Sequence, residues 1–182
     1  MANTKWTLDP LHSELGFKIK HLMITNVSGS IKNFNIEMDT KEEDFATAQV
    51  RLTADIASIS TNNEQRDAHL RNGDFFDTDN HPQMEFRSTK VEDKGDENFT
   101  LVGELTLKGV SKPVRLDVEY SGVTKDPWGG ERAGFTVTGK IKRSDWGISF
   151  NSVLETGGVA LSDEVKINAE VQLVKHPAEV IA

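Results

Sequence analysis

The chain has 182 residues and a mass of 20.2 kDa, which suits one domain of ordinary size. Hydrophobic residues make up 36% of it, too many for a disordered chain, and the net charge of -8 disfavours sequence-independent binding to nucleic acid. Cysteine is absent from the sequence, which excludes disulfides, thiolate metal sites and cysteine nucleophiles. We therefore expect a single domain, residues 1–182, whose stability comes from an apolar core.

The segment around Trp6, at the amino terminus, lacks the run of about seven or more apolar residues that a secretory signal needs. No stretch approaches the ~18 apolar residues of a membrane span. We therefore expect a soluble cytoplasmic protein without a membrane span, or a periplasmic one if a leader preceded this sequence.

Apolar and polar residues alternate with a period of two through most of the chain, which predicts strands with one buried face. After a short strand around Trp6, the predicted strands lie at residues 15–19, 29–39, 50–56, 84–88, 101–107, 114–120, 135–141 and 165–173. Turn signals rich in glycine and aspartate separate several of them, so the connections should be mostly hairpins. Strands with one apolar face are typical of an antiparallel sheet.

One stretch interrupts this alternation. Residues 61–64, with the sequence TNNE, have the form of a capping box and predict a helix over about residues 62–72. Arg66, Asp67 and His69 form its densest polar cluster. Two interpretations remain open for this cluster: a salt-bridged helix surface, or a polar lid that meets the head of an amphiphile.

The predicted fold is all-β, because eight or more long antiparallel strands must close into a barrel or pack as a sandwich to hide their edges. A single helix between strands suits a plug near a barrel mouth. An eight-stranded barrel is just wide enough to be filled by side chains or to hold one small ligand. The inward positions include small residues, which would either leave room inside or allow closer packing: Ala54, Gly103, Gly139 and Ala169.

Motifs for catalysis or metal binding are missing from the sequence. The five histidines show neither the His-x-His nor the His-Glu-x-x-His spacing of metal sites. No Gly-x-Ser-x-Gly elbow and no phosphate-binding loop occurs. His21 continues the inward phase of Phe17 and Ile19, either as a hydrogen-bonded core residue or as a residue that meets a ligand.

Six segments, in this order and spacing, resemble the YceI-like family. They are WTLDPLHS from Trp6, GFKIKHLM from Gly16, RDAHLRNGDFFD from Arg66, HPQMEF from His81, GELTLKGVSKPV from Gly103 and RSDWG from Arg143. The departures are minor: Ser111 stands where threonine is usual in the family, and Trp146 where phenylalanine or another large apolar residue is common. The resemblance covers residues 5 to about 174, nearly the whole chain.

The resemblance implies a lipocalin-like antiparallel barrel of about eight strands, whose apolar tunnel holds an isoprenoid, a quinone or a fatty amide-like chain. It makes a set of apolar residues the candidate tunnel lining, with plain core packing as the other interpretation: Phe17, Ile19, Phe75, Phe76, Phe86, Leu105, Leu107, Phe135, Val137 and Trp146. It makes five polar residues candidates for the tunnel mouth or for a brace between helix and barrel: His21, Arg66, Asp67, His69 and Arg143.

The hypothesis from these patterns is a protein that binds and carries or sequesters one long apolar lipid. It needs no metal and no cofactor besides that lipid, and it is not an enzyme. One alternative is an enzyme acting on an isoprenoid or lipid, with His21 or His69 as the general base. Another is a filled barrel that serves as an interaction module. A homodimer is plausible for a barrel of this size.

Overall fold

The computed structural model describes residues 3–22, 24–148 and 161–176. The strands are β1 (Asn3–Leu8), β2 (Glu14–His21), β3 (Thr25–Ile31), β4 (Phe34–Lys41), β5 (Asp44–Asp55), β6 (Ile59–Ser60), β7 (Gln83–Gly95), β8 (Asn98–Leu107), β9 (Val110–Lys125), β10 (Glu131–Lys142) and β11 (Leu161–His176). The α-helix is α1 (Glu64–Arg71), and the 3₁₀ turns are η1 (Pro10–His12), η2 (Ile56–Ser58) and η3 (Arg143–Trp146). Within the described ranges, no helix has the length and apolar character needed to cross a membrane.

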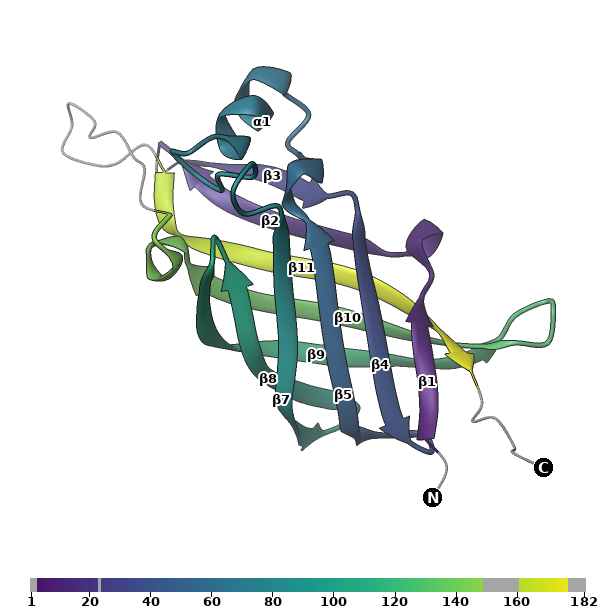
Figure 1. Ribbon diagram of the computed structural model, residues 1–182. Helices are drawn as coiled ribbons and strands as arrows, with labels where there is room; N and C mark the ends of the chain where they lie inside the picture. The colour runs from purple at the N-terminus through teal and green to yellow at the C-terminus, as the bar shows by residue number, and fades with distance from the viewer. Residues whose placement is uncertain (1–2, 23, 149–160, 177–182) are drawn as a thin grey trace.

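The strands form one antiparallel sheet that closes on itself. Its order is β1-β4-β5-β7-β8-β9-β10-β11-β2-β3-β6, and β1 also pairs with β11. Closure depends on β11, whose residues Leu161–Glu170 pair with β2 and whose residues Leu173–His176 pair with β1. Because β1 and β2 follow each other along one edge of β11, the predicted barrel of eight strand positions is confirmed. Figure 1 shows α1 over one end of the barrel, and the start of β1 and the end of β11 near the other end.

The strand predicted over residues 29–39 is wrong in its continuity, since β3 ends at Ile31 and β4 begins at Phe34. The two residues between them bond to η2 instead of to a strand. The amide of Lys32 donates to the Ser58 carbonyl at 3.3 Å, and the amide of Asn33 donates to Ser58 Oγ at 2.9 Å. The chain therefore changes partners here, from β2 and β6 to β1 and β5.

The predicted helix is present, but the predicted capping box is wrong. Asn63 is the N-cap of α1, and its Oδ1 accepts a hydrogen bond of 3.0 Å from the amide of Arg66. Thr61 bonds elsewhere, because its hydroxyl and its amide donate to Oδ1 of the buried Asp67 at 2.6 and 2.8 Å. Because Thr61 bonds to Asp67, it does not cap the helix. The helix therefore begins at Glu64 and not at about residue 62.

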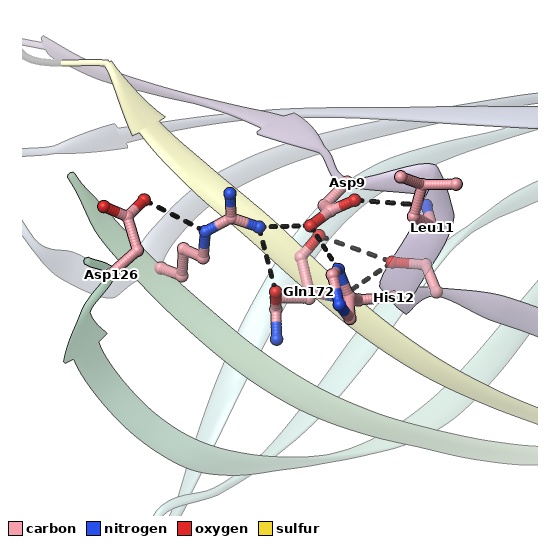
Figure 2. A network of polar contacts seen from close by, with 7 residues as sticks. Asp9, Leu11, His12, Asp126 and Gln172 are labelled. Carbon is pink, nitrogen blue, oxygen red and sulfur yellow. Dashed lines mark hydrogen bonds and ion pairs between the residues drawn. The ribbon is translucent and has the colours of Figure 1, made fainter. Parts of the chain in front are cut away.

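An ion-pair network joins the corner between β1 and β2 to the turn between β9 and β10 (Figure 2). The guanidinium of Arg132 donates to Asp9, to Gln172 Oε1 at 3.1 Å and to Asp126 Oδ2 at 3.2 Å. Burial raises the pKa of Asp9, but hydrogen bonds from His12 and Arg132 outweigh it and leave this pKa below its usual value. The network therefore stabilises the segment between β1 and β2, where the strand that pairs with β11 changes from one to the other.

Candidate functional site

The inner wall of the barrel encloses an apolar cavity of about 470 Å³. Because side chains alternate along each strand, the wall combines the inward residues of β2, β3, β4, β5, β7, β8, β9, β10 and β11. Polar side chains reach this wall at the end that α1 covers, from the end of β2, from the segment around α1 and from η3. They are His21, Thr61, Arg66, His69 and Arg143. The cavity is therefore apolar along its length and polar at one end.

Aromatic rings pack at the other end of the cavity. Phe45, the second residue of β5, lies with its ring centroid 4.8 Å from that of Tyr120 and 5.3 Å from that of Phe135. The ring of the fully buried Trp6 lies 5.5 Å from Phe45, and Trp6 Nε1 donates to Thr40 Oγ1 at 3.1 Å. Burial raises the pKa of Tyr120, so its hydroxyl stays neutral. Phe45 and Phe135 line the cavity, so its wall at this end is aromatic.

Thr61 and its helix partners brace α1 against the barrel. Arg66 Nε donates to Thr61 Oγ1 at 2.7 Å, and Arg66 Nη2 donates to the Thr61 carbonyl at 2.8 Å. Asp67 takes both donors of Thr61, as described above. Thr61 and Asp67 are 5% and 7% exposed, so these bonds are shielded from water. The brace positions Arg66 at the cavity wall, while Asp67 serves the brace and does not line the cavity.

His69 lies further along α1 and is held by a carboxylate. Its Nε2 atom is 2.9 Å from Asp74 Oδ2, and its ring meets that of Phe75 edge to face with centroids 5.0 Å apart. His69 and Asp74 are partly exposed. The contact with Asp74 thus orients the imidazole at the α1 end of the cavity, where it is partly open to solvent.

Arg143 brings a buried positive charge to the same end. The side chain donates from Nε to the Ser162 carbonyl at 3.1 Å and from Nη1 to the Ile148 carbonyl at 2.9 Å. Burial lowers its pKa, and the nearby Asp163 opposes this shift. Asp163 itself accepts two hydrogen bonds from Ser144, which lower its pKa. These hydrogen bonds hold the guanidinium at the cavity wall.

Nine of the ten residues predicted for the tunnel lie in the cavity wall: Phe17, Ile19, Phe75, Phe76, Phe86, Leu105, Leu107, Phe135 and Val137. Trp146 does not line the cavity. Its indole is 2% exposed and donates from Nε1 to the Leu105 carbonyl at 2.9 Å, which attaches η3 to β8. Of the polar candidates, His21, Arg66, His69 and Arg143 line the wall. Contact of any of these residues with a ligand stays a prediction.

The small inward residues leave less room than their size indicates. An added Cβ on Gly103 would lie 2.6 Å from Cζ of Phe86, and one on Gly139 would lie 2.5 Å from Cδ2 of Leu116. Large side chains therefore cover both glycines, which supports the closer-packing interpretation there. Of the four small residues, Ala169 lines the cavity and the others do not.

Three aromatic residues of the wall were not predicted: Phe34, Phe45 and Phe99. Phe34 shares the phase of Ile36, and Phe99 shares the phase of Leu101, so alternation could have identified both. Phe45 is out of phase with Ala48, although both line the cavity. The register between β4 and β5 shifts between Asp39 and Lys41, and alternation within one strand does not reveal such a shift.

A metal centre finds no support in the described residues, which hold no group of three or more histidine, aspartate or glutamate side chains arranged for an ion. The fold and the cavity together define a lipocalin-like barrel with an internal apolar site.

Within that class, the chain belongs to the YceI-like family, whose domain model matches residues 6–173. It is 41% identical over 170 residues to a UPF0312 protein of Staphylococcus epidermidis, covering 93% of this chain and 96% of the relative.

Several solved structures share the fold, including one from Campylobacter jejuni and one from Saccharophagus degradans. The Campylobacter jejuni YCEI protein is 37% identical with a TM-score of 0.73, and the match covers 95% of this chain and 97% of that chain. A domain from Saccharophagus degradans, described as polyisoprenoid binding and implicated in plant cell wall breakdown, matches with a TM-score of 0.65. At 14% identity, over 94% of this chain and 98% of that one, the second likeness concerns the fold.

Proposed function

We propose that the protein binds one long apolar lipid inside the barrel and carries or sequesters it. The observation that carries this proposal is the cavity itself, apolar along its length and polar only at the α1 end. Its volume of about 470 Å³ lies within the usual range of sites that hold a small organic ligand, roughly 300–1,000 Å³. A polyisoprenoid, an isoprenoid quinone or a fatty amide-like lipid has the matching shape, a long apolar tail with one polar head.

Affinity in such a site comes mainly from the tail. Each methylene transferred from water contributes about 0.8 kcal/mol, so binding should strengthen with chain length until the aromatic end at Phe45 is reached. The relative from Saccharophagus degradans, described as polyisoprenoid binding, shares this barrel fold and supports the same class of ligand. The protein should therefore select lipids by length.

The polar end sets the orientation of the ligand. His21 and Arg143 line the wall at this end, and Arg66 is held there by Thr61. A head with carbonyl, amide or phosphate oxygens would lie among these polar side chains, while the tail would point toward Phe45. Head-group preference should contribute less energy than the tail, because the head stays near water.

The test is mass spectrometry of an organic extract of the gently purified protein, with an unrelated protein of similar size as the control. A long-chain species in stoichiometric amount, absent from the control, is the expected result, and it supplies the chain length and the head group together. An empty extract, with no fluorescence response to added polyprenols or fatty amides, would contradict the proposal and favour the filled barrel.

A second candidate, an enzyme acting on the same class of lipid, is favoured by one observation. His69 is oriented by Asp74 at 2.9 Å and lies at the cavity wall, as a general base requires. The discriminating variant carries His21→Ala and His69→Ala together. If the purified protein converts an added polyprenol or fatty amide and this variant binds it without converting it, catalysis is supported. Unchanged lipid with both proteins supports carriage.

A further inference from the structure

Three lysines stand side by side on the outer face of the barrel. In the register of the sheet, Lys18 on β2 is the direct partner of Lys166 on β11, and Lys166 is the direct partner of Lys140 on β10. All three side chains are exposed. Like charges placed directly opposite each other on neighbouring strands are destabilising. The chain has a net charge of -8, so a row of three adjacent positive charges that disfavours folding indicates a function for this surface.

The basic character extends toward the α1 end of the barrel. Lys20 follows Lys18 on the same face of β2, and Lys142 follows Lys140 on the same face of β10. Two acidic groups lie beside these lysines: Glu164 is paired with Lys142 in register, and Asp163 is held by hydrogen bonds from Ser144.

Neutralisation of this face is incomplete. Glu164 Oε1 lies 4.0 Å from Lys140 Nζ, and Lys142 acts on Asp163 through its charge. In the part of the chain that the structure describes, Lys18, Lys20 and Lys166 have no carboxylate oxygen within 4.0 Å. Three of the five lysines thus lack an ion-pair partner among the described residues. We call Lys18, Lys20, Lys140, Lys142 and Lys166 the lysine face.

The charge reverses along the same three strands toward the other end of the barrel. The row next to the lysines is neutral, with Asn168 between Gly16 and Thr138. The row beyond it is acidic, because Glu14 and Glu170 are direct partners. This wall is therefore polarised along the barrel, positive near the α1 end and negative away from it. Such a wall would turn the α1 end toward a negatively charged surface.

Exposed apolar side chains lie next to the lysine face, at the turn between β2 and β3. Leu22 is 39% exposed and Ile24 is 80% exposed. Leu22 directly follows His21, which lines the cavity, and Figure 1 shows the end of β2 and the start of β3 at the same end of the barrel as α1. Apolar residues beside a basic patch are the combination that interfacial binding requires.

From the lysine row and the apolar turn beside it, we propose that this part of the barrel docks on the surface of an anionic lipid bilayer. The lysines face the head-group phosphates, Leu22 and Ile24 enter the head-group layer, and the polar end of the cavity comes to lie at the membrane. This inference goes beyond the proposed function, because docking depends on the outer surface and not on what the cavity holds.

The experiment is co-sedimentation with vesicles of phosphatidylcholine alone or mixed with phosphatidylglycerol, at low and at high salt. The wild-type chain should bind the anionic vesicles, bind the neutral ones much less, and lose binding as salt rises. A variant with Lys18→Gln, Lys140→Gln and Lys166→Gln should bind the anionic vesicles about tenfold or more weakly. Its thermal stability should be equal or higher, since the repulsion within the row is gone.

Two matched controls separate this face from general charge and general hydrophobicity. Lys5→Gln, Lys32→Gln and Lys41→Gln together remove three other exposed lysines and should leave binding within about twofold of the wild type, after correction for net charge. Leu22→Ser with Ile24→Ser should weaken binding. Trp128→Ser, which removes an 83% exposed indole at the β9–β10 turn, should not.

Several results would overturn the proposal: no binding to anionic vesicles, equal binding to both vesicle types, unchanged binding by the lysine-face variant, or an equal loss in the lysine control. Binding to soluble heparin that the lysine-face variant loses, without binding to vesicles, would assign the face to another polyanion. None of these outcomes depends on whether the cavity contains a lipid, so the docking proposal and the proposed function can fail separately.

Discussion

Gly29 lies directly beneath the ring of Phe17, its partner on the neighbouring strand. A Cβ atom added to Gly29 would lie 2.4 Å from Cζ of Phe17 and 2.9 Å from Cγ2 of Thr61. The ring can therefore pack against β3 only because residue 29 has no side chain. Since Phe17 lines the cavity, the absence of one methyl group on β3 helps to determine how much of the cavity stays open.

Gly29→Ala should force the Phe17 ring away from β3 and into the cavity. We expect the amount of retained lipid to fall and the free energy of unfolding to drop by about 1–3 kcal/mol, as in other overpacked cores. Chemical denaturation and quantitative extraction measure the two effects. Gly134→Ala is the control, because its Cβ would meet Ser121 Cβ at an ordinary 3.6 Å. Equal behaviour of the two variants would contradict the packing argument.

Phe135→Glu should abolish lipid retention. Phe135 lines the cavity and packs on Phe45 and Tyr120, so a carboxylate there would be buried among aromatic rings without a partner. Phe135→Leu keeps the site apolar and should retain the lipid, which separates the effect of charge from the loss of the ring. Mass spectrometry of extracts from both variants, with circular dichroism to verify folding, makes the measurement. A folded Phe135→Glu variant with normal lipid content would show that Phe135 does not contact the lipid.

Asp67→Ala should loosen α1 from the barrel. Without the carboxylate, the amide and the hydroxyl of Thr61 lose their buried acceptor, which costs about 1–3 kcal/mol of unfolding free energy. Thermal unfolding measures the loss, and limited proteolysis around α1 shows whether it is local. Gln65→Ala, at an exposed position of the same helix, should change stability by less than about 0.5 kcal/mol. Equal stability of the two variants would exclude the bracing role.

Acid should weaken the network around Arg132. The pKa of Asp126 is lowered, first by a hydrogen bond from the Gly130 amide and then by Arg132, and the pKa of Asp9 is lowered as described above. A carboxylate with a lowered pKa in the folded state stabilises the protein above its unfolded pKa, near 4, and that contribution is lost as pH falls through the folded pKa.

Arg132→Gln should therefore be less stable than the wild type at neutral pH. Its melting temperature should also fall less between about pH 5 and pH 3, because both carboxylates lose a cation that lowers their pKa. Melting curves across this range make the measurement. Parallel pH profiles of the two proteins would show that Arg132 does not set the acid sensitivity.

Local patterns predicted much of the fold and most of the cavity wall. Alternation placed Phe17, Ile19 and Val137 on inward faces, and the cavity includes all three. Trp146 and Phe45 are two residues whose positions such patterns could not predict. Trp146 points from η3 to the Leu105 carbonyl, and Phe45 enters the wall through a register shift between β4 and β5. Neither position follows a period of two, so motif and alternation could not place them.

The sequence by itself determined the strand-rich class, the inward face of most strands and the short helix α1, because these depend on residues close together in the chain. Only the tertiary structure decided how the sheet closes, with β1 and β2 sharing one edge of β11. It also decided that Phe17 covers Gly29 and that Lys18, Lys166 and Lys140 stand in one row. Alternation says which face a side chain takes, whereas its neighbours across the sheet depend on the register between strands far apart in the sequence.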